Sequence, residues 1–134
     1  MYWIIALVAF LGSFAFADWN GLISKPSSVE RNGKTFYEIT TPENLAWFAV
    51  QVNKGHVSYN AVLKNDISIT TSSVTSETIS WEPIGNDSTA ETMFTGEFDG
   101  DGYTISGLYS NATYGGLFGV VGKGGIVKNL KMKN

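Results

Sequence analysis

The stretch that decides the fold is residues 94–132, FTGEFDGDGYTISGLYSNATYGGLFGVVGKGGIVKNLKM. Within it the units Gly-Leu-Tyr, Gly-Leu-Phe and Gly-Ile-Val, which begin at Gly107, Gly116 and Gly125, recur every nine residues. Such a recurrence is typical of short strands that turn at fixed intervals. The stretch therefore predicts a repetitive β architecture, and it indicates no particular activity.

One segment before this stretch has the pattern of an α-helix. Thr41 is a good N-cap, and Pro42 takes the first helical position, where its missing N–H costs nothing. Apolar residues then fall at i, i+3, i+4 and i+7 from Leu45, and Gly55 ends the run. We expect a helix over about residues 42–53, with one apolar face to bury.

The other segments show strand patterns. Residues 34–40 and 61–70 alternate apolar and polar side chains, and short apolar runs continue to the end of the chain. With a single helix, this pattern predicts an all-β fold, and the repeated turn spacing favours stacked parallel coils over a hairpin sandwich. We assign residues 34–134 to this domain and the polar residues 18–33, which include Pro26, to a flexible leader.

Six segments, in this order, resemble a known family. They are Thr-Pro-Glu-Asn-Leu45, Leu-Lys-Asn-Asp-Ile67, Trp-Glu-Pro-Ile-Gly85, the run from Phe94 to Leu108, Gly-Gly-Leu-Phe-Gly119 and Ile-Val-Lys-Asn-Leu130. The arrangement resembles the opening segment of secreted bacterial β-helix proteins with GLUG motifs, a group that includes haemagglutinin-like and adhesin-like surface proteins. This resemblance, over residues 37–132, implies a β-solenoid (parallel β-helix) whose first coil is capped by the helix at 42–53.

Proteins of that family continue for many coils, whereas this chain stops after about the second coil. Each coil of a solenoid contacts only its neighbours, so each end needs a cap. We therefore expect an incomplete solenoid. The chain is then the N-terminal piece of a longer protein, a truncated copy, or a chain that completes its stack through its uncapped C-terminal coil by self-association.

The first 17 residues predict export. Trp3 to Leu11 form an uncharged apolar run, and Ala15-Phe-Ala17 matches the small-x-small pattern of a signal-peptidase site, so we expect cleavage after Ala17. The run is shorter than the roughly 20 residues of a bilayer-spanning helix, so no stable membrane span is expected. The chain has no cysteine and hence no disulfide framework, which fits a bacterial protein that is secreted or held in the cell envelope.

The charge distribution narrows the choice of partners. A net charge of −3 argues against a nucleic-acid partner, because phosphate binding needs a cationic surface. Four lysines nevertheless gather near the end of the chain, at Lys123, Lys128, Lys131 and Lys133. They form either a solvated face that discourages association between strands or a patch for an anionic polysaccharide or lipid.

The glycines and aspartates of the deciding stretch fit tight turns better than a binding loop. We assign structural turn roles to Gly96, Asp99, Gly100, Asp101, Gly102, Gly107, Gly116 and Gly125. No glycine pattern matches a nucleotide-binding loop, so no cofactor is expected. Asp99 and Asp101 could approach a calcium ion, but in an EF-hand register Thr104 stands where glycine is needed and Ser110 where glutamate is needed. No metal site is therefore predicted, and calcium at this turn stays an alternative.

Residues for catalysis are few. His56 is the only histidine and lies in the loop after the expected helix, without a nearby Ser–Asp constellation. Glu97 and Asp99 would point to one side of a strand, as any acids at i and i+2 do, and could in principle act as glycosidase acid and base. Polysaccharide-degrading β-helix enzymes, however, build their clefts from several successive coils, which this chain is too short to supply, so we expect no catalytic residue in it.

Aromatic side chains are the better functional lead. Trp47, Tyr109 and Tyr114 are the candidates for stacking on sugar rings, because tyrosine and tryptophan dominate recognition surfaces. Trp47 lies off the centre of the helical apolar stripe, at the edge of a core contact or exposed. Tyr109 and Tyr114 flank a polar turn and either present their rings or staple that turn.

These observations predict a secreted or cell-surface, non-catalytic module for adhesion or surface assembly, with a polysaccharide or another surface protein as partner. Two alternatives remain. The chain could be the N-terminal fragment of a secreted polysaccharide-acting β-helix enzyme, or a small carbohydrate-binding module.

Overall fold

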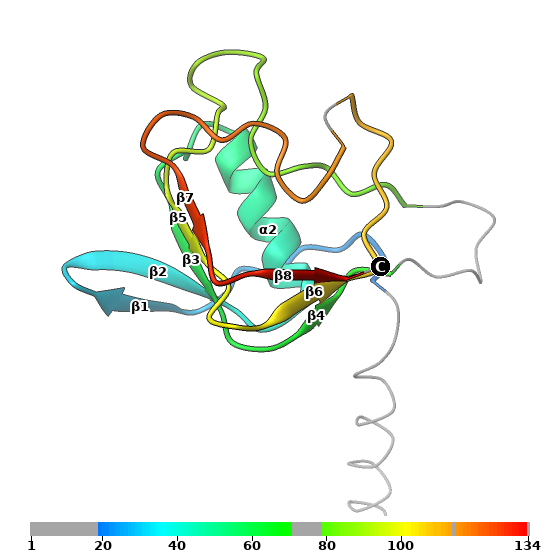
Figure 1. Cartoon of the computed structure of the whole chain (residues 1–134), viewed down its shortest axis with the longest axis horizontal. Helices are drawn as coiled ribbons and strands as arrows, with labels where there is room; N and C mark the ends of the chain where they lie inside the picture. Colours follow the sequence, from blue (N-terminus) through cyan, green and yellow to red (C-terminus); the bar gives the residue numbers. More distant parts are fainter. Residues whose placement is uncertain (1–18, 71–78, 114, 134) are drawn as a thin grey trace, which may run out of the picture.

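The computed structural model describes residues 19–70, 79–113 and 115–133 (Figure 1). In chain order the elements are β1 (Ser28–Arg31), β2 (Lys34–Ile39), α2 (Pro42–Asn53), β3 (Asn60–Leu63), β4 (Ile67–Ser68), β5 (Glu97–Asp99), β6 (Thr104–Ser106), β7 (Ile126–Lys128) and β8 (Lys131–Lys133). The expected signal peptide, its cleavage position after Ala17, and Tyr114 lie outside the described residues.

The strands form two sheets. The five-stranded sheet has the order β1-β2-β3-β5-β7, and all its pairs are parallel except the antiparallel pair of β1 and β2. The three-stranded sheet has the order β4-β6-β8 and is parallel throughout. The chain thus passes from the first sheet to the second three times, through short connections after β3, β5 and β7, and β7 and β8 are the outermost strands on one side (Figure 1).

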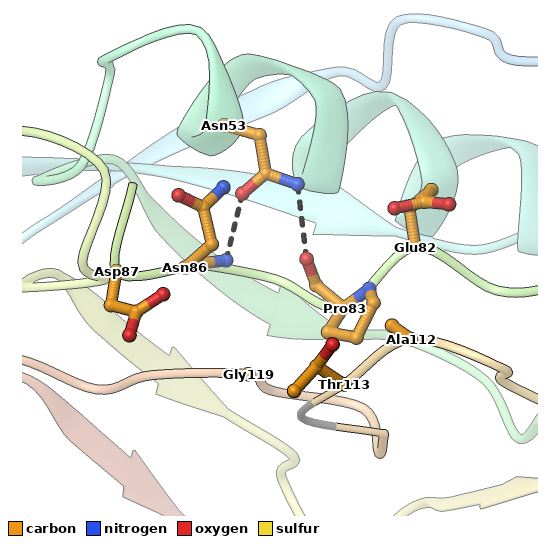
Figure 2. Close-up of a pocket in the computed structure, with 9 residues that line it drawn as sticks. Asn53, Glu82, Pro83, Asn86, Asp87, Ala112, Thr113 and Gly119 are labelled. Carbon is orange, nitrogen blue, oxygen red and sulfur yellow. Dashed lines mark hydrogen bonds between the residues drawn. The ribbon is translucent and has the colours of Figure 1, made fainter. Parts of the chain in front are cut away.

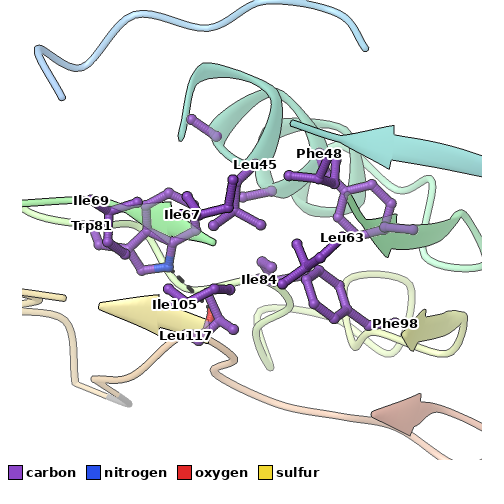
Figure 3. Packing of buried hydrophobic residues seen from close by; sticks show 14 of the residues in the cluster. Leu45, Phe48, Leu63, Ile67, Ile69, Trp81, Ile84, Phe98, Ile105 and Leu117 are labelled. Carbon is purple, nitrogen blue, oxygen red and sulfur yellow. Dashed lines mark hydrogen bonds between the residues drawn. The ribbon is translucent and has the colours of Figure 1, made fainter. Parts of the chain in front are cut away.

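The predicted all-β solenoid with a capping helix is wrong. The described residues form a mixed α/β structure, with one mixed sheet, one parallel sheet and one helix. The helix is not a lid at one end, because its buried side chains Leu45, Phe48 and Val52 belong to the same core cluster as residues of both sheets. Figure 3 shows Leu45 and Phe48 pointing toward Ile67 and Leu63. The helix therefore adds its apolar face to a core that residues of both sheets share.

The nine-residue glycine recurrence does not produce three equivalent strands. The residues after Gly107 form no strand, those after Gly116 contribute a single bridge between Phe118 and Ile84, and only those after Gly125 begin a strand, β7. The recurrence does not give equivalent strands because the three glycines do not share one structural role. Gly107 and Gly116 have positive φ, whereas Gly125 lies against the carbonyl oxygen of Phe94.

The residues expected as a flexible leader belong to the fold. β1 pairs with β2, and Trp19 is 6% exposed, with its ring 5.6 Å from the Trp81 ring. The Asn44 side-chain amide donates to the Ser24 carbonyl at 2.9 Å, which ties this segment to the start of the helix. Burial of Trp19 and pairing of the four-residue strand β1 both stabilise this segment. Both depend on tertiary contacts, which the polar sequence of the segment does not predict.

The helix lies at the predicted residues. The Thr41 side chain accepts a hydrogen bond from the Asn44 backbone N–H at 3.1 Å, and Pro42 takes the first position. Asn44, only 7% exposed, accepts in turn from the Thr40 backbone N–H at 3.1 Å. The bond from Asn44 to Thr41 satisfies a donor that the start of a helix leaves without an intrahelical partner.

Candidate functional site: the β7/β8 edge

The candidate site is the outer edge of β7 and β8, Ile126–Lys128 and Lys131–Lys133, which we call the β7/β8 edge. Two rows of residues on the core face run across the sheets to this edge. They are Ala61, Phe98 and Val127 in the five-stranded sheet and Ile67, Ile105 and Met132 in the three-stranded sheet. The inner two members of each row are at most 2% exposed, whereas Val127 is 40% and Met132 is 49% exposed. The core therefore opens to solvent at this edge.

The backbone of β8 leaves one residue unpaired. The Lys131 N–H donates to the Tyr103 carbonyl at 3.2 Å, and the Lys133 carbonyl accepts from the Gly107 N–H at 3.2 Å. Both lysines therefore direct their backbone groups toward β6. Because successive residues of a parallel strand direct these groups to opposite sides, the N–H and carbonyl of Met132 point away from the sheet.

The backbone of β7 follows the same pattern. The Ile126 N–H donates to the Gly96 carbonyl at 2.9 Å, and the Lys128 carbonyl accepts from the Gly100 N–H at 2.8 Å. The backbone groups of Val127 are thus directed outward. Within the described residues, each sheet presents one donor and one acceptor at this edge, flanked by exposed apolar side chains.

The charges at the edge are positive. Lys128 Nζ lies 3.1 Å from Glu97 Oε2, so this lysine is paired across β7 and β5. Among the described residues, Lys131 and Lys133 form no ion pair, and both are exposed on β8. They flank Met132 along the strand, and their side chains lie on the opposite face from its exposed apolar side chain.

A buried carboxylate holds the corner between β7 and β8. Asp99, 3% exposed, accepts hydrogen bonds from the Asp101 backbone N–H at 2.9 Å, the Asn129 side-chain amide at 3.1 Å and Arg31 Nη2 at 3.2 Å. Burial alone would raise the pKa of this carboxyl. The hydrogen bonds from Asp101, Asn129 and Arg31 outweigh burial and hold the pKa below its ordinary value of 3.8. Asp99 thus links β1, β5 and the β7–β8 connection.

This geometry bears on the calcium alternative. Both oxygens of Asp99 already accept from protein donors, whereas Asp101 is exposed in the turn with φ 50°. In the part of the chain that the structure describes, no three acidic or histidine side chains gather where they could hold a metal ion. Asp99 is therefore arranged as a turn-capping carboxylate.

The predicted turn glycines lie in two kinds of places. Gly102, Gly107 and Gly116 have positive φ. A side chain at Gly96 would overlap the carbonyl oxygen of Tyr59, and one at Gly100 would lie 2.6 Å from the Leu130 Cα, so these glycines permit close approach of neighbouring chain passes. Gly125 permits the same approach beside the carbonyl oxygen of Phe94.

The predicted stacking aromatics do not form one surface. Trp47 is half-buried, with its ring 5.0 Å from that of Tyr37, at the margin of the core. Tyr109 is 48% exposed, and its carbonyl accepts from the Trp81 N–H at 2.7 Å. Tyr114 lies outside the described residues. His56 stacks on Tyr59 with 4.7 Å between ring centroids.

A polar cleft of about 360 Å³ lies on another part of the molecule, beside the end of α2 (Figure 2). Its lining consists of Asn53, Glu82, Pro83, Gly85, Asn86, Asp87, Ala112, Thr113 and Gly119. The Asn53 side chain is used structurally, because its amide donates to the Pro83 carbonyl at 3.0 Å and its oxygen accepts from the Gly85 N–H at 2.9 Å. Of the predicted stacking aromatics that the structure describes, neither Trp47 nor Tyr109 lines this cleft.

Sequence reasoning named the lysines of the β7/β8 edge but missed the exposure of Val127 and Met132 and the residues that hold the corner. The alternation of Leu130 and Met132 with Lys131 and Lys133 was a visible signal for β8. Arg31 and Asn129 carried no signal, because each reaches Asp99 across a large separation in sequence, 68 and 30 residues respectively.

Comparison with known proteins gives two partial similarities. A protein of Evansella cellulosilytica named as a Gly-rich membrane protein is 46% identical over 55 residues, 39% of this chain and 6% of that protein. Halomucin of Haloquadratum walsbyi is 34% identical over 101 residues, 73% of this chain and 1% of halomucin. The chain thus spans a small fraction of the length of these relatives. No family model and no solved structure matches it.

The names of these relatives, Gly-rich membrane protein and halomucin, suggest association with a cell surface or membrane. Among the residues that the structure describes, no helix combines the length and the apolar character needed to cross a bilayer.

Proposed function

We propose that this chain is a non-catalytic module of the cell envelope or surface, in which the β7/β8 edge accepts a further strand of polypeptide. The observation that carries the proposal is the coincidence, at one edge, of outward-directed backbone groups and an exposed end of the core. Val127 and Met132 supply both features in the two sheets. An extended segment placed there would continue a sheet and cover apolar area together, which is how strand addition recognises peptides.

The proposed location has two supports. The predicted signal peptide favours export. The partial similarity to proteins named as a Gly-rich membrane protein and halomucin favours a surface setting. The resemblance to GLUG-motif surface proteins stays a prediction and points to the same adhesive or assembly role.

The test is strand addition itself. The ¹⁵N-labelled chain is titrated with a capped peptide of alternating threonine and valine while backbone amide shifts and hydrogen exchange are followed. We expect shift changes and slowed exchange at Val127 or Met132, because a paired amide no longer exchanges freely with solvent.

Two variants at one position separate backbone pairing from side-chain contact. Met132→Pro removes the outward N–H, which an edge strand tolerates when that N–H faces solvent, whereas Met132→Thr keeps it. We expect the proline variant to lose peptide binding and the threonine variant to retain it. Titrations in which no β7 or β8 amide responds at millimolar peptide would refute the proposal.

A second candidate function is carbohydrate binding at the polar cleft of Figure 2. The lining favours it, because exposed Glu82, Asp87 and Thr113 offer acceptors and a hydroxyl around a space of about 360 Å³. A glycan array tests this candidate, with Glu82→Gln as the matched variant. Absence of binding to every plant and bacterial polysaccharide on the array would exclude this candidate function.

A further inference from the structure

The chemistry of the β7/β8 edge indicates what it binds. This inference rests on the proposed function and narrows it. We infer that the partner is an extended polypeptide segment that carries acidic residues at positions i and i+2 with an apolar residue between them, and that it pairs with β8.

The charges of β8 carry this choice. Lys131 and Lys133 project to the face opposite Met132, and within the described residues neither has an acidic partner. Lys128, in contrast, is already paired with Glu97 at 3.1 Å. A strand added beside β8 would place every second side chain next to the two lysines and the side chain between them next to Met132. Acid, apolar, acid is therefore the complementary pattern.

A second copy of this chain fits less well. Antiparallel pairing of two β8 strands about Met132 would place Lys131 of each copy opposite Lys133 of the other, and like charges directly opposite destabilise a sheet. The strands at the far edges also lack the required pattern. β4 is Ile67–Ser68, and β1 carries a single acid, Glu30, whose carboxylate accepts from the Thr35 hydroxyl at 2.6 Å.

A polypeptide also fits better than an anionic polysaccharide. The outward N–H and carbonyl of Met132 are spaced to pair with another backbone, and its side chain is 49% exposed. An anionic polysaccharide could pair with the lysine charges, but it would leave the Met132 side chain largely exposed. The apolar and backbone features together select a strand.

The test uses the full chain and three capped five-residue peptides that differ only at two positions, with the centres Glu-Val-Glu, Thr-Val-Thr and Lys-Val-Lys. Binding is measured from amide shifts at low and at physiological salt. We expect the acidic peptide to bind about tenfold more tightly than the neutral one at low salt, and less so at physiological salt, because the lysines are exposed.

The double variant Lys131→Glu/Lys133→Glu should reverse the preference, so that the basic peptide binds more tightly than the acidic one. Lys25→Glu/Lys54→Glu makes the same change of net charge at exposed positions outside β8 and should leave the order unchanged. Thermal melts of both variants check that they fold.

The outcomes separate this inference from the proposed function. Equal binding of the acidic and neutral peptides would overturn the acidic partner and leave strand addition standing. Failure of all three peptides to bind would overturn both. Binding of alginate that depends on Lys131 and Lys133, without binding of the acidic peptide, would overturn the inference in favour of a polysaccharide.

Discussion

Replacement of Asp99 by asparagine tests how the β7–β8 corner is held. Asp99 Oδ1 accepts from the Asp101 N–H and the Asn129 amide, and Oδ2 accepts from Arg31 Nη2 at 3.2 Å. Asparagine keeps an oxygen for the first two donors but presents an NH₂ group to the guanidinium. The lost hydrogen bond is charge-assisted, and such a bond contributes about 1.5–3 kcal/mol to stability in a buried site. The Arg31 side chain is 38% exposed, so we expect about 1–2 kcal/mol.

The measurement is urea unfolding at neutral pH, followed by tryptophan fluorescence, since Trp19 and Trp81 are both buried. Asp101→Asn is the matched control. This variant removes the same charge two residues away, from a side chain that is exposed. Asparagine tolerates the left-handed backbone conformation of Asp101, so the free energy of unfolding should stay within about 0.5 kcal/mol of wild type. An Asp99→Asn effect no larger than that of the control would refute the proposed role of the corner.

The pH dependence gives an independent check. The folded pKa of Asp99 lies below its ordinary value of 3.8, so the ionised form stabilises the fold at any pH well above that value. This contribution is lost as the pH falls from about 4 through the folded pKa, where both states become protonated. The stability gap between wild type and Asp99→Asn should therefore be constant near neutral pH and shrink below about pH 4. A gap that persists unchanged into strong acid would contradict the assignment.

Two further substitutions test the helix start and the contact between chain passes. Thr41→Ala removes the acceptor of the Asn44 N–H and should lower the free energy of unfolding by about 1 kcal/mol, as measured by urea unfolding. Gly96→Ala would drive a methyl group into the carbonyl oxygen of Tyr59 and should destabilise by about 1–3 kcal/mol, whereas Gly115→Ala, whose nearest contact is 3.4 Å, should cost much less. A melting temperature lowered equally by both alanine variants would argue against the close approach at Gly96.

Local chemistry explains which elements could be predicted. The helix was predictable because its N-cap, its proline and its apolar spacing all lie within residues 41–55. β2 was predictable for a similar reason, since residues 34–40 alternate and the observed strand is Lys34–Ile39. Prediction of the strand partners failed, because pairing is decided by residues far apart along the chain.

The site shows the same division. The lysines and Met132 could be recognised in the sequence as an alternating pattern, but their exposure could not be predicted. A residue on the core face of a strand is buried only if the sheet continues beyond that strand. Phe98 and Val127 occupy neighbouring positions of one row, yet the first is fully buried and the second is 40% exposed. The difference lies entirely in their distance from the edge of the sheet.

The sequence by itself determined the helix, several strands and the glycine positions where chain passes come close, because these depend on backbone conformation and short-range periodicity. The tertiary structure alone decided that the helix buries its apolar face in a core shared by both sheets, that Trp19 and β1 join the fold, and that Asp99 unites β1, β5 and the β7–β8 corner. Burial and long-range pairing depend on the whole packed chain, and no local pattern specifies which edge of a sheet stays open.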